Sequence, residues 1–215
     1  MPDPDPLSEL STEHAAWEAL GKQLPKLALT THLRREVEAM PPLETAVLHT
    51  KAEKWRAATL LAYVTTHYLL GALDSQPLDK IPANVAVPLH AVATDLGIPP
   101  ILSYALQAMV NWRRIDPDGP VAVGNLTLLN NFLGGQDEEW FVTLHVQIEA
   151  VAGEALSVLQ NMQTAVSQQD STTLITHLHT VANTLQKMHD ILLRMPERCD
   201  PAIYYHRVRP FMFGW

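Results

Sequence analysis

The end of the chain, residues 194–215, reads RMPERCDPAIYYHRVRPFMFGW and combines five aromatic side chains with the only cysteine of the sequence. The ends of most soluble domains are polar and frayed, so this density of rings is not typical of a tail. Three prolines interrupt any long helix there, because proline lacks a backbone donor and clashes with the preceding turn. We therefore predict an ordered, buried loop with a short helical turn, in which Tyr204 forms an aromatic wall and Arg209 offers a planar fork to a carboxylate.

Composition places the chain among folded, acidic proteins. Its 215 residues fit one or two domains, and 47% apolar with 18% charged residues argue against disorder. A net charge of −8 leaves no basic face for a phosphate backbone, so we expect no nucleic-acid partner. The single cysteine excludes an internal disulfide and a multi-cysteine zinc site, and it suits a reducing cytoplasm.

The start of the chain and its hydropathy bear on localisation. The opening MPDPDPLSEL is acidic and rich in proline, unlike a signal peptide. No uncharged apolar run approaches the ~20 residues that span a bilayer. We therefore expect a cytoplasmic protein without a membrane segment.

Apolar residues recur at three- and four-residue steps along most of the chain, a spacing that predicts an all-α fold. We expect a turn-rich connector over 74–87 and a turn from Asp116 to Pro120. Gly134-Gly135 mark an expected boundary between a small helical domain, 1–133, and the first helices of a larger one, 134–215. The expected helices run from Ser8 or Ser11 toward residue 23 and over 33–40, 43–73, 89–96, 100–113, 126–131, 137–166 and 170–193.

Histidines are common catalytic and metal-binding residues, but their spacing in this sequence does not indicate a particular site. His145 lies on the apolar face of the expected 137–166 helix, where a lone histidine is more often a core residue than a catalytic one. His177 and His179 are two apart, so on a helix their imidazoles point in different directions and bind one metal poorly. The sequence contains no HExxH motif, glycine-rich phosphate loop or GxSxG elbow, and we interpret Cys199 as structural.

Three segments resemble the indoleamine 2,3-dioxygenase family. The run CDPAIYYHRVRPFMFGW, residues 199–215, resembles the segment that closes the substrate side of the family's haem pocket. IPPILSYALQAMVNWRRIDPDGP, residues 98–120, resembles a helix and the following turn of the small domain. DEEWFVTLHVQIEA, residues 137–150, resembles the helix over the distal haem face. The resemblance runs from about Lys54 to the end of the chain.

The resemblance implies an activity and its cofactors. It implies that the larger helical domain carries haem b with its iron, and that O2 is a co-substrate. The implied reaction cleaves the indole C2–C3 bond of L-tryptophan to give N-formylkynurenine, in the kynurenine pathway of tryptophan catabolism. The family's iron-ligating histidine lies beyond the matched segments. We therefore expect no metal ligand in this chain, and a complementary C-terminal haem-ligating segment or chain as its partner.

The resemblance also implies roles for five residues. Tyr104 and Phe141 would wall the indole, Tyr204 would pack on the substrate, and Arg209 would pair with the substrate carboxylate. His145 would lie over the haem beside Phe141, where many family members have serine, and is the candidate catalytic residue. An alignment shifted by one residue would instead bring Thr143 or Leu144 into the site.

Two other functions stay open. A haem-dependent oxygenase of secondary metabolism could use the same scaffold on another indole, which the polar residues Gln107 and His145 favour. Gln107 stands where some relatives have cysteine. From a different class, the chain could be a non-catalytic helical module that lacks the iron ligand.

Overall fold

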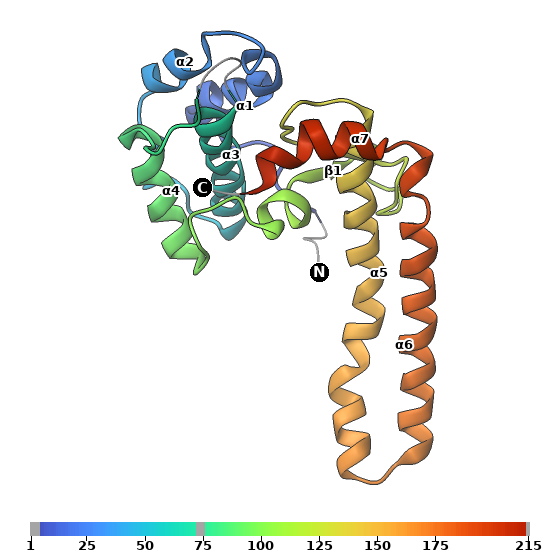
Figure 1. The fold of residues 1–215 in the computed structure, drawn as a ribbon. Coiled ribbons are helices and arrows are strands. Elements are labelled where there is room, and N and C mark those ends of the chain that lie inside the picture. The colour runs from blue at the N-terminus through green and yellow to red at the C-terminus, as the bar shows by residue number, and fades with distance from the viewer. Residues whose placement is uncertain (1–4, 72–75, 214–215) are drawn as a thin grey trace.

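The fold is all-α, as the spacing of apolar residues predicts. A computed structural model of the protein describes residues 5–71 and 76–213 (Figure 1). The α-helices are α1 (Ala15–Leu27), α2 (Leu33–Ala39), α3 (Lys51–Leu70), α4 (Ala83–Leu96), α5 (Gln136–Ser167), α6 (Ser171–Leu192) and α7 (Pro201–Ile203). Short tighter or wider helical turns are η1 (Thr12–His14), η2 (Ala105–Met109), η3 (Met195–Glu197), η4 (Tyr204–Val208) and η5 (Arg209–Phe213).

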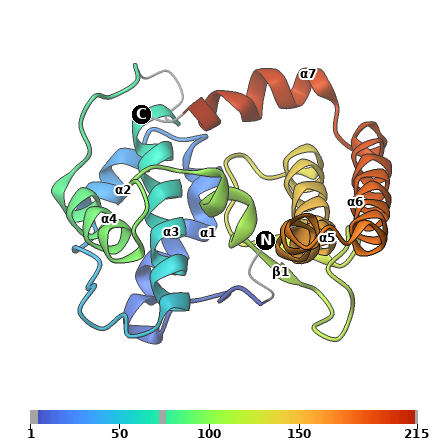
Figure 2. The same ribbon diagram turned by 90° about the horizontal axis from the view of Figure 1, so that it is seen from below.

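Figures 1 and 2 show two groups of helices joined by the C-terminal segment. Helix α3 packs against α1, α2 and α4, whereas α5 and α6 form a long antiparallel hairpin that extends away from them. The segment from α7 to η5 leaves the end of α6, crosses α5 and returns to α3. This crossing brings residues from distant parts of the chain to one place.

Helix α3 is buried on all sides over most of its length. The Thr50 side chain accepts the N–H of Glu53 at 3.2 Å, and the Glu53 carboxylate accepts the N–H of Thr50 at 2.7 Å. This capping box begins the helix at Lys51, so the predicted start at residue 43 is wrong. Every residue from Arg56 to Leu69 is buried, which explains why apolar side chains occur on all sides of the helix rather than along one stripe.

Burial forces the polar side chains of α3 to find partners. The Nη2 and Nε atoms of Arg56 lie 2.5 and 3.0 Å from the two carboxylate oxygens of Glu18, and its Nη1 donates to the Asn130 side chain at 2.6 Å. The His67 ring nitrogens lie 2.7 and 2.8 Å from two carbonyl oxygens, one in its own helix and one on Phe132. Burial lowers the pKa of His67, and both carbonyls oppose that shift. These contacts tie α3 to α1 and to the loop before α5.

Two predicted helices are wrong. Residues 100–113 hold the single wide turn η2 followed by strand β1 (Trp112–Arg114), and strand β2 (Leu126–Leu128) replaces the other helix. The strands pair antiparallel, and the Asn111 side chain extends their pairing by donating to the Asn130 carbonyl at 2.8 Å and accepting the Asn130 N–H at 2.9 Å. Strand pairing depends on a partner far along the chain, which local spacing does not reveal.

Helix α4 is longer than the predicted helix over 89–96 and contains a proline. The helix begins at Ala83, so part of the predicted 74–87 connector is helical, and Pro88 lies inside it. Asn84 anchors its first turn by donating to the carbonyls of Val37 and Met40, both at 2.8 Å. Pro88 is buried, and its packing offsets the cost of the missing N–H. The predicted turn after β1 is confirmed, since the Gly119 N–H donates to the Asp116 carbonyl at 3.1 Å.

The two long helices of the hairpin are confirmed. The acidic first turn of α5 and the Asp170 cap on the Thr173 N–H of α6 begin these helices where the sequence predicts. Length and composition alone would allow α5 to cross a membrane, a property that core helices of soluble proteins share. Large apolar side chains of the hairpin stay exposed, namely Leu156, Leu159, Val166, Ile175, Leu178, Leu185 and Leu192.

The buried ion pair generates the first prediction. Arg56→Met removes the guanidinium and leaves the Glu18 carboxylate buried without a cation, so we expect the free energy of unfolding to fall by about 3–5 kcal/mol. Urea denaturation followed by circular dichroism measures the loss. The double variant Glu18→Gln/Arg56→Met removes both charges and should lose far less than the sum of the two single variants.

An exposed ion pair provides the matched control. Lys22 and Glu9 are more than half exposed, so Lys22→Met should cost about 1 kcal/mol at most. Strictly additive losses for Glu18 and Arg56 would contradict the coupling.

Candidate active site

The C-terminal segment is more helical than predicted. From Pro201 to Phe213 it forms continuous helical turns, α7, η4 and η5, instead of a loop with one turn. The Asp200 carboxylate caps this run by accepting the N–H groups of Ala202 and Ile203, and Pro201 occupies the first position, where its missing donor costs nothing. The predicted interruption is right before Pro201, since α6 ends ahead of it, but it is wrong at Pro210, which lies inside η5.

Contacts at both ends seat this segment over α5. At its start, the Asp200 N–H donates to the Asp137 carboxylate at 2.7 Å, and the Trp140 indole N–H donates to the Arg194 carbonyl at 3.0 Å. At its end, the Phe211 ring stacks on Phe132 at 5.3 Å and lies 5.6 Å from the His67 ring. The segment thus spans from the hairpin to α3 and covers the first turns of α5.

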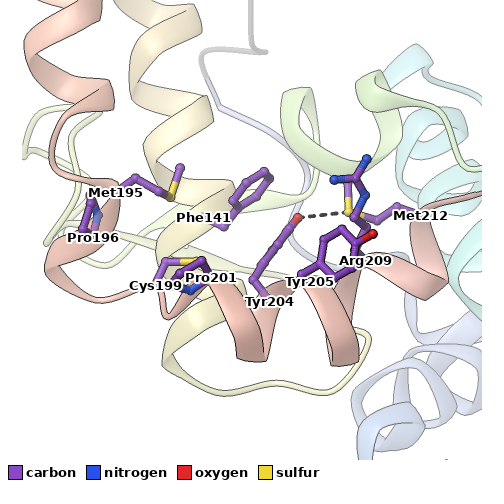
Figure 3. Close-up of a pocket in the computed structure, with 9 residues that line it drawn as sticks. All are labelled: Phe141, Met195, Pro196, Cys199, Pro201, Tyr204, Tyr205, Arg209 and Met212. Atoms are coloured by element: carbon purple, nitrogen blue, oxygen red, sulfur yellow. Dashed lines mark hydrogen bonds between the residues drawn. The ribbon is translucent and has the colours of Figure 1, made fainter.

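A cavity of about 600 Å³ opens beneath the segment. Figure 3 shows Met195 and Cys199 toward one end and Arg209 and Met212 toward the other, with Tyr204 between them. Burial raises the pKa of the Cys199 thiol, consistent with its interpretation as structural. The lining residues are Phe141, Met195, Pro196, Cys199, Pro201, Tyr204, Tyr205, Arg209 and Met212.

A smaller cavity of about 200 Å³ adjoins the first. Phe141 and Met212 line both cavities and so form a wall between them. The structure thereby brings all five predicted site residues to this pair of cavities. The small cavity is lined by Tyr104, Gln107, Ala108, Phe141, Val142, His145 and Met212.

A hydrogen bond to the backbone decides which ring nitrogen of His145 carries the proton. Its Nδ1 lies 2.7 Å from the Phe141 carbonyl oxygen, an acceptor, so in the neutral ring the proton sits on Nδ1. The Nε2 atom is then an acceptor. The ring is also held by the Phe141 ring at 4.3 Å and, edge to face, by Tyr104 at 6.2 Å. His145 is half-buried and can accept one hydrogen bond from a ligand, but in its neutral form it has no second proton to donate.

Tyr104 contacts Glu149, a residue near the site that sequence reasoning missed. Its hydroxyl donates to the Glu149 carboxylate at 3.0 Å. Partial burial, and then the negative charge of Glu149, raise the pKa of Tyr104 and keep the phenol protonated. The spacing of four residues between His145 and Glu149, which puts both on one face of α5, could have revealed this carboxylate.

Arg209 lies at the open end of the larger cavity. Its guanidinium carbon is 5.3 Å from the centre of the Tyr205 ring, a cation–π distance. Glu197, an alternative ion-pair partner by sequence proximity, instead binds Arg194 at 3.1 Å. Sequence reasoning also missed Met212, whose sulfur accepts the Tyr204 hydroxyl at 2.9 Å. Thr143 and Leu144, the neighbours that a shifted alignment would bring in, do not line either cavity.

Comparison with known proteins identifies the family of the chain. The family model described as indoleamine 2,3-dioxygenase matches residues 1–215. The chain is 34% identical to indoleamine 2,3-dioxygenase 1 of Mus musculus and 32% identical to indoleamine 2,3-dioxygenase acdA of Aspergillus candidus. These matches cover 99% and 100% of this chain and 52% and 54% of the relatives. A protein of Haliotis diversicolor named myoglobin is 28% identical, over 98% of this chain and 54% of its own length.

The chain spans about half the length of the curated relatives that it matches. The family model nevertheless covers every residue of the chain. The chain belongs to the indoleamine 2,3-dioxygenase family.

Proposed function

We propose that this chain forms the substrate side of a haem-dependent dioxygenase that cleaves the indole C2–C3 bond of L-tryptophan to N-formylkynurenine. The observation that carries the proposal is the pair of adjoining cavities that share Phe141 and Met212. The small, largely apolar cavity suits an indole ring, and the larger one offers Arg209 to an amino-acid carboxylate. Membership of the family supports the same reaction class.

His145 would hold the indole rather than take its proton. Its Nε2 atom would accept a hydrogen bond from the indole N–H, because the Phe141 carbonyl already engages Nδ1. An indole N–H is far too weak an acid for imidazole to deprotonate, so the contribution of His145 would be orientation. Tyr104 and Phe141 would confine the ring, and Tyr204 would support it through the Phe141 stack at 3.9 Å.

We propose that the residues of the small cavity face haem. Haem b would supply the oxygen chemistry when bound, and the apolar lining of the small cavity suits contact with a macrocycle. Phe141 and His145 would contact it. We propose that the iron ligand comes from a complementary C-terminal segment or chain.

The α5–α6 hairpin supports that partner. Ile175, Leu178 and Leu185 are 54%, 48% and 56% exposed, and their steps of three and seven residues place them on one face of α6. A contiguous apolar face of this kind marks a protein interface rather than a solvated surface. The relatives are about twice as long as this chain, so their second half is the occupant that we propose.

A second candidate rests on Gln107. Its side chain is buried in the wall of the small cavity, and within the described residues its Nε2 atom has no hydrogen-bond partner. This extra polarity favours the alternative of an oxygenase that acts on another indole.

The partner proposal predicts the behaviour of haem. Residues 1–215 alone should not give the spectrum of stoichiometric, five-coordinate ferrous haem ligated by histidine, whereas addition of the complementary half should produce it. Visible absorption and an intact mass of the assembly make the measurement. That spectrum from the chain by itself would contradict the proposal and would make His145, His189 or His206 the ligand to test.

If Arg209 binds the substrate carboxylate, replacing it by lysine should reduce activity as much as replacing it by alanine. An ammonium cannot reproduce the bidentate fork, so in the assembled enzyme Arg209→Lys and Arg209→Ala should each lose about 2–4 kcal/mol of transition-state stabilisation in kcat/KM for tryptophan. Tryptamine, which lacks the carboxylate, should show little loss. Arg207→Ala removes a guanidinium that does not line the cavity and serves as the control. Equal losses on both substrates would refute the assignment.

The indole contact of His145 predicts a change in selectivity. Wild type should prefer tryptophan over 1-methyltryptophan, which lacks the N–H, and His145→Ser should reduce that preference while remaining active. His145→Leu, which offers no polar group, should lose more activity than His145→Ser. His179→Ser on α6 is the matched control. If wild type and His145→Ser discriminate equally, and both His145 variants mainly lose thermal stability, then His145 is a core residue.

A further inference from the structure

The wall between the two cavities is built from three side chains of different elements. Phe141 of α5 stacks on Tyr204 of η4 with ring centres 3.9 Å apart, and Met212 of η5 lies beside them (Figure 3). Phe141 and Met212 each line both the 200 Å³ and the 600 Å³ cavity. The position of Met212 therefore bears on whether these spaces are separate or joined.

One hydrogen bond holds Met212 in this wall. The Tyr204 hydroxyl donates to the Met212 sulfur at 2.9 Å, the contact drawn in Figure 3. Methionine has a flexible unbranched side chain and a thioether that accepts hydrogen bonds only weakly, so its conformation depends on such a partner. Burial raises the pKa of the Tyr204 phenol, so the hydroxyl remains a donor at neutral pH.

Tyr204 is itself firmly placed. It is 9% exposed, its N–H donates to the Asp200 carbonyl at 2.9 Å, and its ring is covered by Phe141. Phe211, the residue before Met212, is held against Phe132 and His67. Both ends of the hydrogen bond thus start from fixed backbone positions, and the Met212 side chain is the adaptable part of the wall.

We propose that Tyr204 and Met212 form a specificity-determining partition, in which their hydrogen bond keeps the small cavity closed to indoles that carry bulky ring substituents. The inference rests on the proposed function, because it takes the small cavity as the indole site. Loss of the bond would free Met212 and join the two cavities. The joined space would admit a larger ring system without a change in the charged residues of the site.

The first arm of the test uses the protein without ligand. Methionine residues labelled with 13C in the methyl group report on Met212 by NMR, with Met212→Leu identifying its resonance. Tyr204→Phe should shift and narrow that resonance, because a freed side chain averages over rotamers. Tyr68→Phe is the matched control, since it deletes a hydroxyl that donates to Glu38 outside both cavities. An unchanged Met212 resonance in Tyr204→Phe would overturn the partition.

The second arm compares the dissociation constants of indole and 5-benzyloxyindole for the assembled protein by equilibrium dialysis. Wild type should prefer indole, and Tyr204→Phe and Met212→Leu should each reduce that preference about fivefold, the scale of one hydrogen bond. The double variant should show no further change, because both single variants break the same bond. Effects that multiply, or a wild type that does not discriminate, would overturn the partition.

The two arms separate this inference from the proposed function. Failure of the assembled wild-type protein, with haem and the complementary half, to bind indole would contradict the proposed indole site, and the ligand-free methyl resonance would still decide whether Tyr204 holds Met212. Indole binding with no N-formylkynurenine from the assembled protein would contradict the proposed reaction while the selectivity ratios continue to test the partition.

Discussion

The buried pair of Arg56 and Glu18 is the interaction on which the rest of the structure depends. Helix α3 lies inside the molecule, and a guanidinium there is tolerable only with a carboxylate and further acceptors around it. Glu18 brings α1 to α3, and Asn130 brings the loop that leads to α5. One buried cation therefore sets the relation between the N-terminal helices and the start of the hairpin.

The same helix carries the support of the candidate site. His67 is a buried residue of α3, and its ring contacts the Phe132 carbonyl and the Phe211 ring. Phe211 precedes Met212, and Met212 lines both cavities. The site is thus assembled where a crossing segment rests on two elements, α3 and α5. Such a site depends on the packing of the whole chain rather than on one motif.

Within the site, three polar groups are each engaged by a neighbour. The Phe141 carbonyl engages Nδ1 of His145, Glu149 accepts the Tyr104 hydroxyl, and Met212 accepts the Tyr204 hydroxyl. The small cavity is also lined by Gln107, whose amide nitrogen has no partner within the described residues, and the larger cavity by Arg209. An acceptor nitrogen on His145 and the guanidinium of Arg209 are the groups on which the proposal of an indole substrate with a carboxylate rests.

The sequence by itself determined the helices α5 and α6, because the spacing of their apolar residues and their caps are local. It also singled out residues 194–215, because so many aromatic rings are not typical of a chain end. It did not reveal the strands, the pairing of Asn111 with Asn130, or the continuous helical turns after Pro201. The strands and the Asn111 contacts depend on partners outside the local pattern, whereas the helical turns start at a local cap, Asp200 followed by Pro201, which the expectation that proline breaks helices obscured. The proton position on His145 and the bond between Tyr204 and Met212 were likewise decided by tertiary structure, because a hydrogen bond needs two atoms within about 3 Å and spacing in sequence specifies only which face a side chain occupies.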